Sequence, residues 1–153
     1  MSSRLFQHIR EERGLAYAVS SNLTTYSDAG MITVYAGCAT DKVGEVIDLT
    51  RSELRELRDS LAPDEELRRA KGHLKGSLML SLESTSSRMA HLARQELTFG
   101  RHFTLDETLN SIEQVTAADV QRVAADLFQV SGLVATVVGP RNGRALSADV
   151  LKL

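Results

Sequence analysis

The sequence predicts an α+β fold, with a mainly antiparallel sheet and helices packed on one face of it. Two runs rich in Val, Thr and Tyr, residues 17–26 and 31–39, flank the turn residues Ser-Asp-Ala-Gly at 27–30. Strand-like runs on either side of such a turn are typical of an antiparallel hairpin. From residue 41 to 127, apolar residues recur at helical spacing, and a late apolar run at 133–138 predicts a short buried strand. A block of helices set between strands favours the α+β class.

A helix is expected before the hairpin. Ser2 or Ser3 can cap it, the apolar face of Leu5, Phe6 and Ile9 carries it to about Glu12, and Gly14 ends it. After the hairpin, Asp41 is expected to cap the next helix.

The later helices have clear start and stop signals. Pro63 suits the first position of a helix, and the acidic residues that follow complement its positive end. The remaining signals are the helix break or new cap at residues 84–87, the stop near Gly100, and the capping boxes at 104–107 and 116–119.

Length and composition predict one domain over residues 1–140 and a loose tail over 141–153. The net charge of −2 gives no electrostatic reason to expect nucleic acid as a partner, and no stretch approaches the ~18 apolar residues of a membrane span. No signal peptide is visible, which favours a cytoplasmic location. The single cysteine, Cys38, lies in an apolar run and is expected to be a small core residue.

The sequence offers no zinc site of its own. A hydrolytic zinc centre usually needs three protein ligands, and none of the four histidines begins His-Glu-x-x-His or His-x-x-Glu-His. The nearest approach is His8-Ile-Arg-Glu-Glu12, where Glu12 stands in place of the second histidine. A weak metal site of His8 and Glu12 is one interpretation, and a solvated helix edge is the other. We therefore expect no metal and no other cofactor bound to this chain.

Several segments together resemble one family. Ser-Ser-Arg-Leu-Phe-Gln at 2–7 and Ile-Arg-Glu-Glu-Arg-Gly-Leu-Ala-Tyr at 9–17 are similar to the C-terminal half-domain of pitrilysin/insulinase-family zinc peptidases and processing peptidases. Further matches follow in the family's order at residues 26–30, 75–78, 82–89 and 137–140. The resemblance implies two homologous α+β halves, of which the N-terminal half binds the zinc. It also implies that Arg10 and Tyr17 of this half reach the substrate as transition-state donors.

The chemistry explains why such donors are needed. Attack of water on a peptide carbonyl places negative charge on its oxygen, and a guanidinium and a phenol hydroxyl aimed at that oxygen stabilise the transition state more than the substrate. The other interpretation is that Arg10 pairs with a nearby acid and Tyr17 is an ordinary strand aromatic.

Three hypotheses for function remain open. The first is one half of a zinc endopeptidase, inactive alone, whose partners are a zinc-bearing half-domain or subunit and a peptide substrate. The second is a non-catalytic structural or partner subunit of the same family, and the third is a module that captures peptides by strand addition. In the family, strands and a helix precede the 2–7 motif, so the chain is expected to be truncated at its N-terminus. An exposed sheet edge should then make it self-associate.

Overall fold

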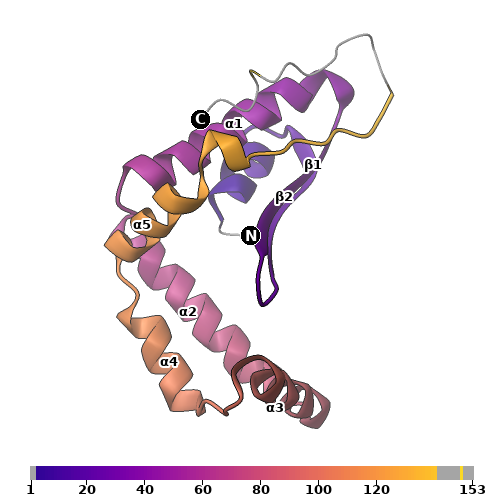
Figure 1. The fold of residues 1–153 in the computed structure, drawn as a ribbon. Coiled ribbons are helices and arrows are strands. Elements are labelled where there is room, and N and C mark those ends of the chain that lie inside the picture. The colour runs from indigo at the N-terminus through magenta and orange to yellow at the C-terminus, as the bar shows by residue number, and fades with distance from the viewer. Residues whose placement is uncertain (1–2, 141–148, 150–153) are drawn as a thin grey trace. The chain divides into compact units, whose positions relative to one another are not determined.

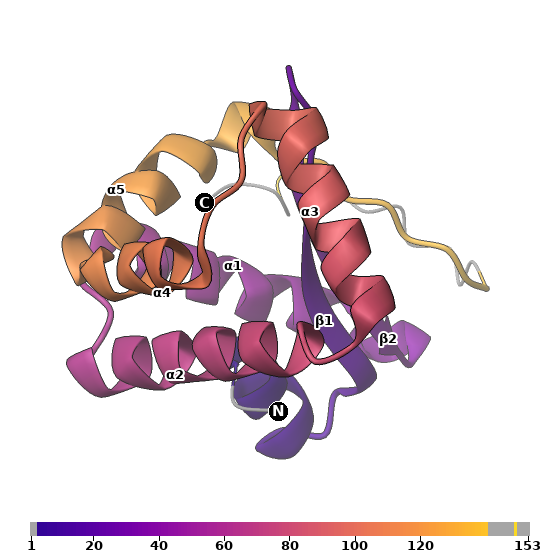
Figure 2. The same ribbon diagram turned by 90° about the horizontal axis from the view of Figure 1, so that it is seen from below.

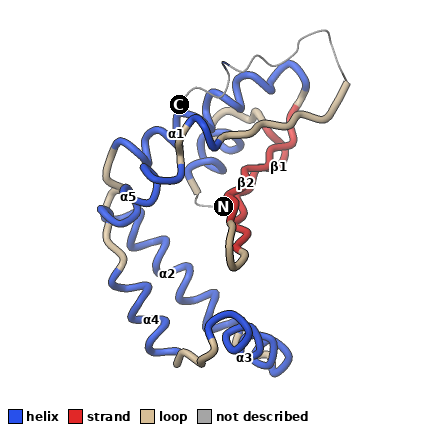
Figure 3. Tube along the Cα trace, viewed as in Figure 1, coloured by secondary structure: helices blue, strands red, loops and turns tan. Residues whose placement is uncertain are grey.

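The computed structural model describes residues 3–140 and residue 149, in two compact units. The first unit contains residues up to Ser60 and from Arg122 onward, and the second contains Leu61–Gln121. The described strands form a two-stranded sheet, drawn in red in Figure 3 among helices drawn in blue. The predicted α+β class with an antiparallel sheet is confirmed.

The first unit begins with η1 (Phe6–Glu11), a π-helical turn in the place where an α-helix was expected. Residues 4 and 5 are already helical, and the Phe6 N–H donates to Ser3 Oγ at 3.4 Å at the start of this segment, whereas the N-cap residue of η1 itself, Leu5, makes no side-chain cap. Gly14, at φ 58°, ends η1: the Gly14 N–H donates to the Arg10 carbonyl at 3.1 Å and the Leu15 N–H to the Ile9 carbonyl at 2.9 Å. Each bond spans one residue more than its counterpart in an ordinary Schellman end, which fits the wider π-helix. Only glycine adopts this φ without a steric penalty.

An antiparallel hairpin follows, formed by β1 (Ala16–Thr25) and β2 (Gly30–Cys38), within one residue of the predicted strands. The Tyr26 N–H donates to the Ala29 carbonyl at 2.8 Å and closes the turn. The register pairs Ala18 with Gly37 but Ala16 with Cys38, so Tyr17 is the extra residue of a β-bulge.

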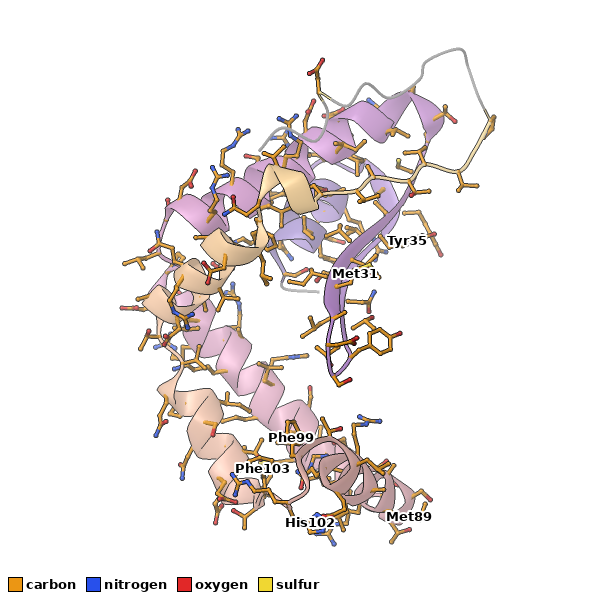
Figure 4. The ribbon with its side chains drawn as sticks, viewed as in Figure 1. Met31, Tyr35, Met89, Phe99, His102 and Phe103 are labelled. Atoms are coloured by element: carbon orange, nitrogen blue, oxygen red, sulfur yellow. The ribbon has the colours of Figure 1, made fainter. Side chains whose placement is uncertain are left out.

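The core of the first unit lies between one face of this hairpin and two helical elements, η1 and α1 (Val43–Asp59). Ile9 is fully buried and packs with Leu15, Ala16 and Val46. Val19 and Ala36, which face each other in the register, lie against this cluster. Because side chains alternate along a strand, this face of the hairpin is the core face and the opposite one, with Met31 and Tyr35, is exposed (Figure 4).

The second unit consists of helices. Those wholly within it are α2 (Asp64–Ser81), α3 (Thr85–Phe99) and α4 (Leu105–Gln114), and α5 (Ala117–Leu127) begins in it. α2 and α4 lie side by side (Figures 1 and 2), joined by Lys75 Nζ–Glu113 Oε2 at 2.6 Å. The ring of Phe99 meets that of Phe103 edge-on, with centroids 5.3 Å apart (Figure 4).

Most predicted helix signals are confirmed. Ser84 caps α3 by accepting the Ser87 N–H, Gly100 ends that helix in the left-handed conformation, and Thr104 with Glu107 forms a full capping box. Thr116 and Asp119 exchange the same two bonds at 3.0 and 3.1 Å. Pro63 precedes α2 as its N-cap rather than occupying its first position.

Two predicted elements are wrong. Asp41 caps no helix, because it lies inside the 3₁₀ turn η2 (Thr40–Lys42) that leads into α1 without a side-chain cap. The segment 133–138, after η3 (Val130–Gly132), is neither a strand nor buried, and Val134 and Val138 are 88% and 93% exposed. An extended segment becomes a strand only when a neighbour pairs with it, and no strand in the described part of the chain does so. Apart from residue 149, the predicted tail lies outside the described residues.

Candidate functional site

Arg10 lies in the last turn of η1 and its side chain is 42% exposed. Its guanidinium carbon lies 4.8 Å from the centre of the Phe6 ring, and its Nε is 3.9 Å from Glu11 Oε1. An exposed contact between neighbouring residues at this distance contributes little to stability. The stacking on Phe6 limits the conformations of the side chain, which remains partly exposed to solvent.

Tyr17 is presented differently, at the bulge where β1 begins. Tyr17 is 88% exposed and does not pack in the core of its unit. A bulge residue has no direct partner across the ladder, and bulges commonly redirect a side chain beside an active site. The phenol hydroxyl is therefore available as a hydrogen-bond donor to a ligand.

Arg10 and Tyr17 lie on either side of the turn at Gly14, which joins the end of η1 to the start of β1 within the first unit. Within residues 3–140, no hydrogen bond or ion pair links Arg10 to Tyr17. Tyr17 lines a shallow hollow of about 620 Å³, which Arg10 does not line. The hollow is bounded by Gly14 and Leu15, by Gly37 and Cys38 at the end of β2, and by Ala39, Asp41 and Lys42 after it.

Cys38 brings a thiol to this hollow. Burial, and secondly the negative charge of Asp41, raise the pKa of the Cys38 thiol. The protonated thiol is a poor nucleophile, and Cys38 packs against the core cluster as predicted. The hollow thus offers a hydroxyl and charged edges but no activated nucleophile.

His8 does not form the predicted solvated helix edge, nor does it pair with Glu12. Its Nδ1 lies 2.5 Å from Oε1 of Glu53, a buried carboxylate on α1. The second oxygen of Glu53 is buried without a hydrogen-bond partner among the described residues. One turn along α1, Arg4 and Glu56 form a parallel ion pair at 3.3 Å. These contacts fasten η1, and with it Arg10, to α1.

Glu53 was not among the residues predicted from the sequence, although its spacing along the helix indicates that it is buried. It lies seven residues after Val46, which places it on the same, buried face of the helix. A carboxylate on a core face usually has a cationic or donor partner.

Replacing Glu53 by alanine should lower the free energy of unfolding by about 2 kcal/mol, because it removes a charge-assisted hydrogen bond and leaves a small cavity. Chemical denaturation monitored by circular dichroism would measure the change. Glu56→Ala is the matched control, since its side chain is 55% exposed and should cost about 1 kcal/mol or less. Equal effects of the two substitutions would show that the His8–Glu53 contact carries no special weight.

The second unit has a cavity of about 320 Å³, with a mainly apolar lining that includes Leu78, Leu92 and Phe103. Beside it, the buried Gln95 accepts the Phe103 N–H at 2.9 Å, so its amide nitrogen must donate to His91 Nε2 at 2.8 Å. No group of three potential metal ligands occurs here or elsewhere in the described residues.

Comparison with known proteins defines the class to which this architecture belongs. A family profile described as "Peptidase M16 inactive domain" matches residues 1–74. An uncharacterized zinc protease of Mycobacterium tuberculosis is 42% identical over 144 residues, covering 94% of this chain and 33% of that protein. An uncharacterized zinc protease of Bacillus subtilis is 42% identical over 128 residues, covering 84% of this chain and 31% of its own length.

The fold has a counterpart among solved structures. A chain in the structure titled "Complex III2 from Candida albicans, Inz-5 bound" superposes with a TM-score of 0.73 at 22% identity, covering 82% of this chain and 30% of that one. At this identity the likeness concerns the fold alone.

The family resemblance found in the sequence is thereby confirmed: residues 1–74 match the inactive domain of the M16 peptidase family, and the relatives at 42% identity are named zinc proteases. It spans about a third of the length of the curated relatives it matches. None of the described helices has the length and apolar character needed to cross a membrane.

Proposed function

We propose that this chain supplies the zinc-free half of a zinc endopeptidase site, with Arg10 and Tyr17 as donors to the substrate carbonyl. The observation that carries the proposal is the exposure of both side chains next to the η1–β1 turn. Tyr17 is 88% exposed at a bulge, and Arg10 stacks on Phe6 while its side chain stays 42% exposed. Neither side chain belongs to the core cluster of the first unit.

The chemistry of the two groups suits the task. Arg10 carries a permanent charge and several N–H donors, and Tyr17 carries a neutral O–H donor. Both can form stronger hydrogen bonds as negative charge grows on the carbonyl oxygen. These bonds lower the barrier because they stabilise the transition state more than the bound substrate. The chain's contribution would be to orient the peptide and stabilise the oxyanion.

The zinc of such an enzyme does not fit the residues described here. His8 is engaged by Glu53, and no third ligand approaches the pair in the described part of the chain. We therefore infer that the metal belongs to a separate zinc-bearing half-domain or subunit, which is the partner of this chain along with the peptide substrate. A cytoplasmic location and self-association remain predictions.

Reconstitution tests the proposal. The 153-residue chain alone should bind no stoichiometric zinc and cleave no peptide, and cleavage should appear when a zinc-bearing half from the same source is added. Metal analysis and a quenched-fluorescence peptide assay measure both results. One tight zinc per isolated chain would contradict the proposal. A stable, zinc-loaded complex that cleaves nothing would favour the structural-subunit alternative instead.

A further inference from the structure

Gly37 lies inside β2, and the conformation of the chain does not explain why this position is a glycine. Among the described residues only Gly14 and Gly100 have positive φ, so Gly37 has a backbone geometry that any residue can adopt. A Cβ built on Gly37 would meet only Tyr35 Oη, at the ordinary contact distance of 3.5 Å. Neither strain nor internal crowding therefore requires glycine here. Glycine within a strand weakens it, and it often marks a place where a ligand or another backbone approaches closely.

The surroundings of Gly37 indicate what approaches. Gly37 pairs with Ala18, directly after the bulge at Tyr17, and both Gly37 and Tyr17 line the hollow of about 620 Å³. The missing side chain lowers the surface beside the exposed phenol. Tyr35, two residues earlier, lies on the same outer face of β2 and projects from the hairpin (Figure 4), with its hydroxyl near Gly37.

We infer that Gly37 is a substrate-contacting, specificity-determining residue: it lets the main chain of an extended peptide lie across the end of β2, next to Tyr17. The inference rests on the proposed function, because it places the peptide beside the donor of that same site. The ligand class is an uncharged stretch of polypeptide backbone, which the Tyr35 hydroxyl can also hydrogen-bond. A side chain at position 37 would raise the surface and push this backbone away from Tyr17.

The test compares two glycines of the same strand in the reconstituted peptidase. Gly37→Ala should raise KM for a peptide substrate about tenfold or more, the scale of a one-carbon misfit in a site, with a smaller change in kcat. The thermal midpoint should stay close to wild type, since the added Cβ meets no backbone atom. Gly30→Ala, at the other end of β2, is the matched control and should leave KM unchanged. Wild-type kinetics for Gly37→Ala would overturn the inference.

A second measurement separates this inference from the proposed function. The ¹⁵N-labelled chain is titrated with an acetylated, amidated heptapeptide of alanine and serine, and the amide signals are followed by NMR. The signals of Gly37 and Tyr17 should shift, and Gly37→Val should abolish the shifts. Shifts that are absent, or equally large at Gly30, would refute the contact even if Tyr17→Phe impairs turnover. Shifts at Gly37 in a complex without peptidase activity would support the contact and count against the proposed catalytic role.

Discussion

Tyr17→Phe in the reconstituted peptidase should lower kcat by about 10²- to 10³-fold, which corresponds to about 2.7–4 kcal/mol in the barrier. The substitution removes one hydroxyl from a side chain that is 88% exposed, so it leaves the core and the hairpin register intact. A donor that acts mainly in the transition state lowers kcat and kcat/KM together while KM changes little. Steady-state kinetics on a quenched-fluorescence peptide would show this pattern.

The control for this substitution is Tyr26→Phe. Tyr26 is 73% exposed and stands at the turn of the hairpin, away from the hollow at the other end of the strands. Its loss of a hydroxyl should leave kcat unchanged. Arg10→Lys adds a test of the second donor: it keeps the charge but loses the guanidinium fork, so it should also slow turnover. Wild-type turnover in both the Tyr17 and Arg10 variants would remove these residues from the mechanism.

The hairpin could be predicted from the sequence because its signals are local. Val-, Thr- and Tyr-rich runs on either side of a four-residue turn determine both strands within one residue of their observed ends. The helix caps at Ser84, Thr104 and Thr116 were predictable for the same reason, since each depends on a side chain and a backbone N–H three residues apart.

Features that depend on distant contacts could not be predicted in this way. The segment 133–138 has the composition of a buried strand, but composition does not provide a pairing partner. No local motif signals the π-helical form of η1 or the bulge at Tyr17, although both lie beside core residues, Ile9 and Ala16. His8 and Glu53 lie 45 residues apart, so their contact is visible only in the folded chain.

In the candidate site, too, the sequence predicts some features and not others. Arg10 and Tyr17 were identified only through the family resemblance, because one arginine and one tyrosine seven residues apart have no distinctive pattern. What the structure adds is their presentation: one stacks on a neighbouring ring, and the other is turned outward by a bulge. Their role remains a proposal. The hollow beside Tyr17 and the place of Gly37 in its lining have no sequence signal beyond a glycine within a strand.

Ile9→Ala should have the largest effect on stability, lowering the free energy of unfolding by about 2–5 kcal/mol. Ile9 is the one fully buried large side chain in the described residues, and it joins η1 to Leu15, Ala16 and Val46. A domain is typically stable by only about 5–15 kcal/mol, so this loss is a large share of the total. Urea denaturation followed by circular dichroism would measure it.

Ile32→Ala is the matched control, because it removes the same atoms from a side chain that is 42% exposed near the tip of the hairpin. It should cost about 1 kcal/mol or less, the range of strand preferences. Since Ile9 is adjacent to Arg10 and anchors the helical turn that presents it, the milder Ile9→Val should cost about 0.5–1.5 kcal/mol while leaving the fold intact. If Ile9→Ala proved no worse than Ile32→Ala, the cluster around Ile9 would not be the core that holds η1, and the placement of Arg10 would need another explanation.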